Sequence, residues 1–185
     1  HMISVYDDQI PLIICPDEII HETDSLSCEV WIDIPIPDYS DNCGIQSVYN
    51  DYTGTEDASA VYSAGITTVT WMVTDIYGNT SSCDLNVHVI DQYPPEIECP
   101  SDIIQQADSG LCEAYVVVPV PEIYDNCGID SLYNDYTGTD DASAIYYFGT
   151  TTVTWIVFDL SGNSAECSMQ VTVESDGELT MTCPQ

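Results

Sequence analysis

The chain has 185 residues, of which 32 are acidic and none is lysine or arginine, so its formal net charge is −32. Without a basic patch to neutralise phosphates or anionic headgroups, the composition excludes nucleic acid and anionic membrane surfaces as partners. The carboxylates cannot form salt bridges with lysine or arginine, so they must be spaced apart, hydrated or neutralised by bound cations. Trypsin-like proteases find no cleavage site.

The predicted elements, in chain order, are strands. Glu29–Ile36 is rich in valine, isoleucine and aromatic residues and ends at a Pro-x-Pro motif. Thr67–Thr74 alternates threonine with apolar or aromatic residues, which is typical of a half-buried strand. The turn Asp75–Asn79 and the alternating run Cys83–Val89 then predict a hairpin, with a Gly-Asn pair supplying positive backbone dihedrals. The same series recurs in the second half of the chain, over Glu113–Val120, Thr151–Phe158, Asp159–Asn163 and Cys167–Val173.

Convincing helical periodicity is absent. The best candidate, Asp17–Glu22, is too short for a helix. No run of about 18 apolar residues occurs, so no membrane-spanning segment is predicted. Six or seven short strands in each half of the chain predict an all-β fold in which two antiparallel sheets pack as a sandwich.

A fixed period relates the two halves of the chain. Asp41-Asn42-Cys43-Gly44-Ile45 recurs 84 residues later as Asp125-Asn126-Cys127-Gly128-Ile129, and the other repeated motifs recur at the same offset with no insertion. Such a period indicates one small domain copied in series. We expect the chain to be a window from a longer array, although His1-Met2 is equally explained as a cloning remnant. The expected parts are the last strand of a preceding repeat (1–7), repeat 1 (8–91), repeat 2 (92–175) and the start of a third (176–185).

Nine cysteines at recurring positions point to disulfides formed in an oxidising compartment. Zinc is the competing interpretation. The shortest cysteine spacing is 13 residues, no Cys-x-x-Cys pair occurs, and the three histidines do not recur with the repeat. These spacings favour disulfides over a structural zinc site.

An ordered set of motifs carries a family resemblance. In each repeat the order is Cys-Pro-x-(Asp/Glu)-Ile, Cys-x-x-x-(Val/Ile)-x-x-Pro, Asp-Asn-Cys-Gly, Gly-(Ile/Thr)-Thr-Thr-Val-Thr-Trp, Asp-x-x-Gly-Asn and Cys. This order resembles the HYR (hyalin repeat) module over both full repeats. The resemblance implies two tandem immunoglobulin-like antiparallel β-sandwich domains of the kind used in extracellular, often adhesive, proteins of animals and bacteria. It implies no catalytic residues, and the absence of lysine and arginine departs from the family.

An immunoglobulin-like strand order then predicts the disulfides. The first strand ends where the second begins, which brings Cys15 near Cys28. The Asp41–Gly44 loop and the last hairpin share the opposite end, which brings Cys43 near Cys83. The predicted pairs are Cys15–Cys28, Cys43–Cys83, Cys99–Cys112 and Cys127–Cys167, and Cys183 is left over because its partner would lie in a following repeat.

The aromatic residues divide into two groups. Trp71 and Trp155 lie mid-strand and are predicted to be core residues packed near a disulfide. Strand propensity explains most of the 13 tyrosines. The alternative is an exposed aromatic face formed by Tyr49–Tyr52, Tyr133–Tyr136, Tyr62 and Tyr146-Tyr147.

Clustered carboxylates make calcium the expected metal. We expect Asp91 at the end of repeat 1 to meet loop residues of repeat 2, so that calcium stiffens the repeat junction. The competing interpretation is a solvated acidic surface in which the Asp-Asn pairs only shape turns. No EF-hand spacing is present. The candidate ligands are Asp17, Glu18, Asp91, Asp125, Asn126 and Asp159, with Glu56 and Asp57 as further candidates.

Other sites have weaker signals. Paired carboxylates arise by chance among 32 acids, so they give little support to glycosidase chemistry. A nucleophilic triad needs a histidine, but His21 aligns with Gln105 and His88 with Thr172. Asn79-Thr80-Ser81 matches an N-glycosylation acceptor that repeat 2 lacks.

Together these features predict a non-enzymatic segment of a secreted or cell-surface adhesin, stalk or filament that is stapled by disulfides and resists proteases. Its partners would be neighbouring repeats or identical subunits, and Ile3–Asp7 would be free to complete a neighbour's sheet by strand addition. The alternative is an adhesion module that binds a carbohydrate or a protein through its tyrosine-rich face. Neither nucleic acid nor membrane insertion is expected, and no cofactor is required apart from the calcium considered above.

Overall fold

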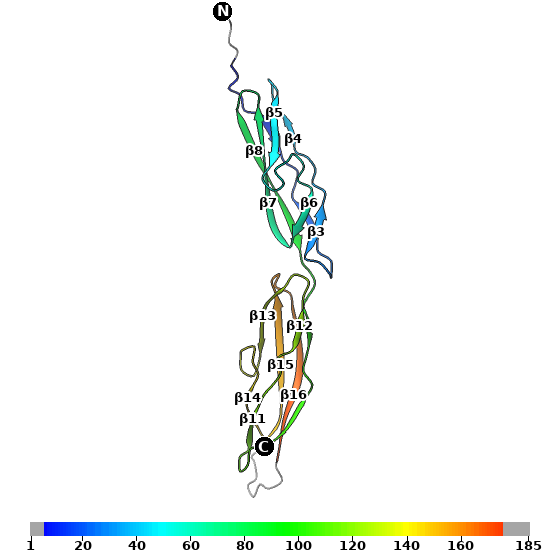
Figure 1. Cartoon of the computed structure of the whole chain (residues 1–185), viewed down its shortest axis with the longest axis vertical. Coiled ribbons are helices and arrows are strands. Elements are labelled where there is room, and N and C mark those ends of the chain that lie inside the picture. The colour runs from blue at the N-terminus through cyan, green and yellow to red at the C-terminus, as the bar shows by residue number, and fades with distance from the viewer. Residues whose placement is uncertain (1–5, 176–185) are drawn as a thin grey trace, which may run out of the picture. The chain divides into compact units, whose positions relative to one another are not determined.

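The computed structural model describes residues 6–175 and is all-β, as predicted. The chain separates into two compact units, 1–92 and 93–185 (Figure 1). Within the described residues, no helix is long and apolar enough to cross a membrane. The strands of the first unit are β1 (Leu12–Ile14), β2 (Ile19–Glu22), β3 (Glu29–Ile32), β4 (Asp38–Ser40), β5 (Ile45–Asn50), β6 (Ala60–Ser63), β7 (Gly65–Asp75) and β8 (Thr80–Ile90). Those of the second are β9 (Glu96–Glu98), β10 (Ile103–Gln106), β11 (Glu113–Val116), β12 (Glu122–Tyr124), β13 (Ile129–Asn134), β14 (Ala144–Tyr147), β15 (Gly149–Asp159) and β16 (Ser164–Glu174).

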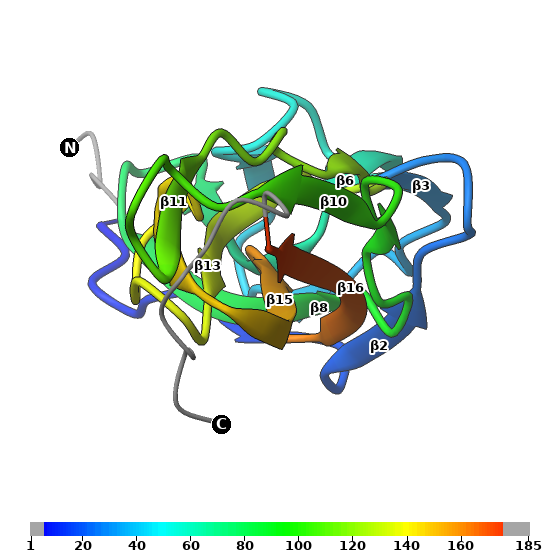
Figure 2. The same cartoon turned by 90° about the horizontal axis from the view of Figure 1, so that it is seen from below.

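Each unit is a sandwich built on one long hairpin. In the first unit β7 and β8 pair antiparallel and lie at the centre of a four-stranded sheet of order β2-β8-β7-β5. The short sheets β1-β4 and β3-β6 complete the domain. The second unit repeats this plan, and in Figure 2 its strands β10, β16 and β15 follow one another in a sheet that β13 completes. The hairpin predicted from alternating residues is confirmed in both units.

Three details of the strands differ from the sequence-based expectation. The stretch that came nearest to a helix contains β2, which pairs parallel with β8, so the sandwich is not purely antiparallel. The strand predicted to reach Ile36 ends at Ile32, and the Ile34 amide donates to the Ser59 hydroxyl at 2.9 Å in place of a ladder bond. In the hairpin turn only Gly78 has a positive φ, 92°, since no described non-glycine residue has one.

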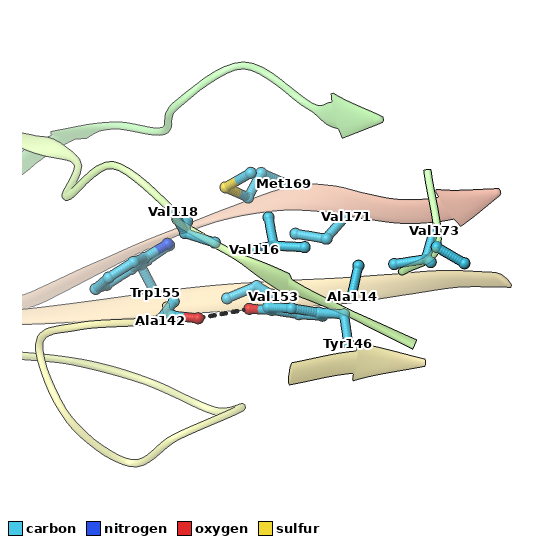
Figure 3. Close-up of a cluster of buried hydrophobic side chains, with 11 residues drawn as sticks. Ala114, Val116, Val118, Ala142, Tyr146, Val153, Trp155, Met169, Val171 and Val173 are labelled. Atoms are coloured by element: carbon cyan, nitrogen blue, oxygen red, sulfur yellow. Dashed lines mark hydrogen bonds between the residues drawn. The ribbon is translucent and has the colours of Figure 1, made fainter. Parts of the chain in front are cut away.

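The core of each unit lies between the hairpin and the shorter sheets. In the first unit Trp71 and Val69 from β7 pack with Leu85 and Val87 from β8, and all four are essentially inaccessible to solvent. In the second unit Trp155 packs with the equivalent residues (Figure 3). The tyrosine hydroxyl in this core is satisfied, because Tyr146 donates to the Ala142 carbonyl at 2.8 Å. The prediction that both tryptophans are core residues is therefore confirmed.

The predicted disulfide pairing is wrong. Cys15 is bonded to Cys83 and Cys99 to Cys167, with a Cα–Cα distance of 5.7 Å in each case. Cys43 is a free, exposed thiol. These bonds overturn all four predicted pairs: Cys15–Cys28, Cys43–Cys83, Cys99–Cys112 and Cys127–Cys167. The cysteines Cys28, Cys112 and Cys127 are disulfide-bonded, although not as predicted.

Strand β2 explains the error. The prediction placed Cys15 and Cys28 at one end of the sandwich, with no strand between them. Instead β2 intervenes and runs alongside the second half of β8, pairing with Val87–Ile90. Cys15 precedes β2 and stays beside the first half of β8, where the Ser81 hydroxyl donates to the Pro11 carbonyl. Cys15 therefore lies beside Cys83, and β2 separates Cys15 from Cys28 along the chain.

Some predictions concern residues outside the described range. The expected strand Ile3–Asp7 lies partly there, and its two described residues, Tyr6 and Asp7, are not in a strand. The expected third repeat, 176–185, and the leftover Cys183 also lie outside the described residues.

Candidate metal centre

Three aspartates from separate segments come together at one end of the first unit. Asp7 precedes β1, Asp41 follows β4, and Asp75 is the last residue of β7. One carboxylate oxygen from each lies within 4.8 Å of the others. Asp7 is 6% exposed and Asp75 is fully buried, whereas Asp41 is half-buried. We call this group the Asp7–Asp41–Asp75 cluster.

Local turn chemistry fixes Asp41. Its Oδ1 accepts hydrogen bonds from the backbone amides of Cys43 at 2.8 Å and Gly44 at 2.9 Å. Gly44 has a φ of 115°, a conformation that favours glycine. The second oxygen of Asp41, Oδ2, is buried and has no hydrogen-bond partner among the described residues. The turn thus uses one oxygen and leaves the other with unshared lone pairs.

Asp75 closes the turn of the β7–β8 hairpin. Its Oδ1 accepts from the amides of Tyr77 and Asn79, both at 2.8 Å, and its Oδ2 accepts from the Asn79 side chain at 2.7 Å. Burial acts to raise the pKa of Asp75, but hydrogen bonds from Asn79, Tyr77 and Gly78 outweigh burial and lower it. The carboxylate is therefore ionised at neutral pH despite its burial.

Asp7 joins the cluster from the segment before β1. Its Oδ1 accepts from the Gln9 amide at 3.1 Å, and its buried Oδ2 has no hydrogen-bond partner among the described residues. The pKa of Asp7 is lowered, first by the Cys43 thiol beside its carboxylate and then by the Gln9 amide. The same contact with Asp7 is the main reason that the pKa of the Cys43 thiol is raised to about 11.

The internal repeat reproduces the two turns. Asp125 Oδ1 accepts from the Cys127 and Gly128 amides at 2.8 Å, as Asp41 does in the first unit. Asp159 Oδ1 accepts from the Ser161 and Asn163 amides, both at 2.8 Å, and Asp159 is 2% exposed.

The predicted calcium ligands lie in different surroundings. Asp125 and Asp159 each use one carboxylate oxygen to shape a turn of the second unit, and the 5% exposed Asp91, at the end of the first unit, accepts from the Thr23 hydroxyl at 3.1 Å. Asp17 and Glu18 are exposed and do not belong to the Asp7–Asp41–Asp75 cluster. The Asn126 side chain donates to the Cys127 sulfur at 3.4 Å. Of the two further candidates, Glu56 accepts from the Tyr39 hydroxyl at 2.5 Å and Asp57 accepts from the Ser59 amide at 2.8 Å.

Sequence reasoning missed the Asp7–Asp41–Asp75 cluster, although the signal is present in the sequence. Its three members lie 84 residues before Asp91, Asp125 and Asp159, which the sequence had already indicated as candidate ligands. Assigning residues 1–7 to a preceding repeat hides the cluster. It separates Asp7 from the loop and the hairpin turn that follow it, so the three aspartates are not considered together.

The predicted tyrosine-rich face is only partly exposed. Tyr62 and Tyr146 are fully buried, so they are core residues and not surface ones. Tyr52 stacks on Tyr62 with ring centroids 4.5 Å apart, and Tyr136 stacks on Tyr146 at 4.3 Å. The hydroxyls of Tyr52 and Tyr136 each also donate a hydrogen bond to a backbone carbonyl. The members left substantially exposed are Tyr49, Tyr52, Tyr133, Tyr136 and Tyr147.

The predicted glycosylation acceptor is engaged within the fold. The Asn79 side-chain nitrogen, which would carry a glycan, donates to Asp75 Oδ2 at 2.7 Å and to the Asp7 carbonyl at 3.1 Å. Attachment of a sugar would break these bonds. The structure therefore does not favour Asn79 as a modified residue in the folded chain.

A shallow groove in the second unit collects further acids. It is lined by Glu96, Glu98 and Glu122, with Tyr124 and two isoleucines. Glu98 and Glu122 are directly opposite each other on the paired strands β9 and β12, and all three glutamates are exposed. This is the arrangement of a solvated acidic face, in contrast to the buried carboxylates of the Asp7–Asp41–Asp75 cluster.

Known proteins similar to this chain include sea-urchin hyalins. Hyalin of Strongylocentrotus purpuratus is 30% identical over 142 residues, which is 75% of this chain but 11% of that protein. Hyalin of Lytechinus variegatus is 29% identical over 173 residues, which is 91% of this chain and 31% of that protein. A Rattus norvegicus protein named sushi, von Willebrand factor type A, EGF and pentraxin domain-containing protein 1 is 24% identical over 91% of this chain, and the match spans 5% of it.

Similar solved structures are other tandem β domains. Immunoglobulin domains 1–4 of Sidekick-1 align with a TM-score of 0.46 and 10% identity, covering 89% of this chain and 49% of that one. Drosophila N-cadherin EC1-4 aligns with a TM-score of 0.39 and 10% identity, covering 90% and 50%. The HYR domain profile matches residues 6–89 and 90–173, so the Asp7–Asp41–Asp75 cluster lies within the first match. Because these two matches cover nearly all of the sequence, the chain belongs to the HYR domain family and consists of two HYR domains in tandem.

Proposed function

We propose that this chain is a segment of a non-enzymatic extracellular repeat array, such as a long cell-surface adhesin, stalk or filament. The observation that carries the proposal is repetition of a self-sufficient domain. Each unit has its own hydrophobic core and its own disulfide, and corresponding strands pair in the same register. Arrays of such domains build length by adding copies.

The disulfides and the relatives support an extracellular location. Cys15–Cys83 and Cys99–Cys167 are bonds of the kind that persist in oxidising compartments. The two hyalins and the rat protein are much longer than this chain, which spans between 5% and 31% of them. The natural partners of the chain, on this proposal, are neighbouring repeats or identical subunits.

Protease resistance is a further part of the proposal. The sequence offers no lysine or arginine to trypsin-like enzymes. Proteases of broader specificity would need local unfolding, which the disulfides oppose. We expect digestion by proteinase K to be slow for the oxidised chain and to accelerate after reduction. Equal rates before and after reduction would remove this part of the proposal.

Scattering and imaging test the array itself. A structural spacer is expected to give an elongated particle by small-angle X-ray scattering, and the intact assembly is expected to show a regular repeat distance by electron microscopy. A glycan array is expected to show no selective retention. A compact particle, or selective glycan binding, would contradict a purely structural role.

A second function is favoured by the exposed aromatic residues. On the β3-β6 sheet Trp31 is 60% exposed and is directly opposite Val61, which is 44% exposed. Tyr49 on β5 is 41% exposed. Exposed aromatics of this kind bind carbohydrates and proteins, so an adhesion module is the alternative.

The two functions are separated by surface variants. Tyr49→Ala is suitable because this ring does not stack on the buried tyrosines, whereas Tyr133 stacks on Phe158. An adhesion module is expected to lose retention on its glycan or protein ligand in this variant, with its melting temperature unchanged. Tyr52 is a poor choice because its ring covers Tyr62, so its removal would also disturb the core.

A further inference from the structure

We propose that the Asp7–Asp41–Asp75 cluster binds one Ca²⁺ ion. The inference goes beyond the proposed function, because the site would exist whether the repeats act as spacers or as binding modules. It rests on the geometry of the cluster, whose three residues lie in one compact unit.

The first argument is that the negative charge in the cluster has no counterion. Three carboxylates approach within 4.8 Å, and two of them are at least nine-tenths buried. The chain has no lysine or arginine to pair with them. Neither His21 on β2 nor His88 on β8 belongs to the cluster. Buried charges are normally paired or coordinate a metal, so a bound cation is the missing partner.

The second argument is that a buried oxygen has unused bonding capacity. Asp7 is only 6% exposed, and its Oδ2 accepts no hydrogen bond from the described residues. The Oδ2 of Asp41 is in the same situation. Buried polar atoms without a partner are rare, because each loses its hydration without compensation. Two such oxygens beside a third carboxylate form a site that a cation would satisfy.

The donor set selects the ion. All three ligands are carboxylate oxygens, which hard divalent cations prefer. Mg²⁺ is usually held by one or two carboxylates and keeps several waters, whereas Ca²⁺ takes about six to eight oxygen ligands in a flexible geometry. Three carboxylates in one cluster therefore favour Ca²⁺.

The positions of the ligands give the ion a structural role. Asp7 belongs to the segment entering the domain, Asp41 to the loop before β5, and Asp75 to the turn of the long hairpin. These segments are far apart in sequence, and Asp41 and Asp75 already use one oxygen each to shape a turn. A shared ion would tie all three segments together at one end of the domain.

Calorimetric titration of the full chain with CaCl₂, after removal of divalent ions by a chelator, tests the proposal. We expect a saturable site with a dissociation constant of about 10⁻⁴–10⁻³ M, as in other extracellular calcium modules. The melting temperature is expected to rise with Ca²⁺ concentration and to fall again with chelator. Mg²⁺ is expected to bind more weakly.

Matched asparagine variants identify the ligands. Asp7→Asn keeps the Oδ1 that accepts from Gln9 but replaces the unpartnered oxygen. It should weaken Ca²⁺ binding at this cluster by more than the roughly tenfold typical of indirect changes around a metal. Asp51→Asn is the control, because Asp51 also accepts a hydrogen bond from a backbone amide, that of Thr70 at 2.8 Å, but lies outside the cluster. The control should leave the site intact.

Three results would overturn the proposal. One is the absence of Ca²⁺ binding. The second is weak, non-saturating binding that Asp7→Asn and Asp51→Asn reduce equally, which would indicate a diffuse acidic surface. The third is a melting temperature that Asp7→Asn raises while Ca²⁺ has no effect, which would indicate that a shared proton relieves the repulsion. None of these results depends on whether the chain forms an elongated array.

Discussion

The two HYR domains have nearly the same structure. The features that they share are those that the fold requires, whereas the features that differ belong to one copy alone. The hairpins β7–β8 and β15–β16 have identical registers, and the central disulfide has the same Cα–Cα distance of 5.7 Å in both. Two of the differences concern a thiol and an indole. Cys43 is a free thiol whereas Cys127 is disulfide-bonded. The Trp71 indole is hydrogen-bonded, whereas the buried Trp155 indole nitrogen has no partner among the described residues.

Removal of the central disulfide is expected to have the largest effect. The Cys15–Cys83 bond spans 68 residues, and the chain-entropy estimate for a loop of that size is about 4 kcal/mol. Cys15→Ala combined with Cys83→Ala should lower the free energy of unfolding of the first domain by that amount, as measured by calorimetry on the full chain. The matched pair is Cys99→Ala with Cys167→Ala, which spans the same number of residues. Unequal losses would contradict the equivalence of the two bonds.

A buried asparagine is expected to come next. Asn50 is fully buried and accepts from the amides of Tyr52 and Thr53, while it donates to the Thr53 hydroxyl and the Thr55 carbonyl. Asn50→Ala removes all of the side-chain hydrogen bonds of Asn50 and leaves buried groups unpaired, so it should cost about 3 kcal/mol.

The second repeat and the surface supply the comparisons for this variant. Asn134 makes the same contacts, so Asn134→Ala should cost the same amount. Asn86 is exposed and only accepts from the Thr68 hydroxyl, so Asn86→Ala should change stability by no more than about 0.5 kcal/mol. A negligible loss on removing Asn50 would show that water replaces its bonds. Urea denaturation of the three variants measures these values.

The two tryptophans give a smaller, differential prediction. Trp71 donates to the Glu56 carbonyl at 3.0 Å, whereas Trp155 has no such partner among the described residues. Replacing either by phenylalanine removes a similar volume from a similar core. The packing costs should therefore cancel, and Trp71→Phe should be more destabilising than Trp155→Phe by about 1 kcal/mol. An equal cost, measured by urea denaturation, would mean that the indole bond contributes nothing to stability.

The repeat, the long hairpin and the core tryptophans were predictable because their signals are local. Residues of Thr67–Thr74 alternate with period two, and the alternation itself places Trp71 on the buried face. The disulfides were not predictable in this way, because the pairing depends on β2. Its sequence, Ile-Ile-His-Glu, has no alternation, and only pairing with β8 makes it a strand. Because β2 was not predicted, Cys28 was expected beside Cys15.

The candidate site was half predictable for a related reason. Turn residues such as Asp125 and Asp159 were recognised from their Asp-Asn-Cys-Gly and Asp-x-x-Gly-Asn motifs. The contact between them depends on where loops meet at the end of a sandwich, which no local pattern encodes. The burial of Asp7 was also hidden, because isolated aspartates are usually exposed. Only the period linked it to Asp91.

The smallest expected effect concerns reactivity and leaves stability unchanged. The pKa of Cys43 is raised to about 11 from an ordinary 9.0, first by its contact with Asp7 and then by burial. Thiolate is the reactive form, so at pH 8 iodoacetamide should modify Cys43 about 100-fold more slowly than an ordinary thiol, and the rate should rise about tenfold per pH unit toward pH 11. Cys127, which is disulfide-bonded, should be modified only after reduction. Peptide mapping at a series of pH values measures both, and Asp7→Asn should accelerate modification of Cys43 because it removes the neighbouring charge. A fast reaction at pH 8, unchanged by Asp7→Asn, would mean that the thiol and the carboxylate are not in contact in solution. The first domain would then differ from the second in more than whether this one cysteine is oxidised.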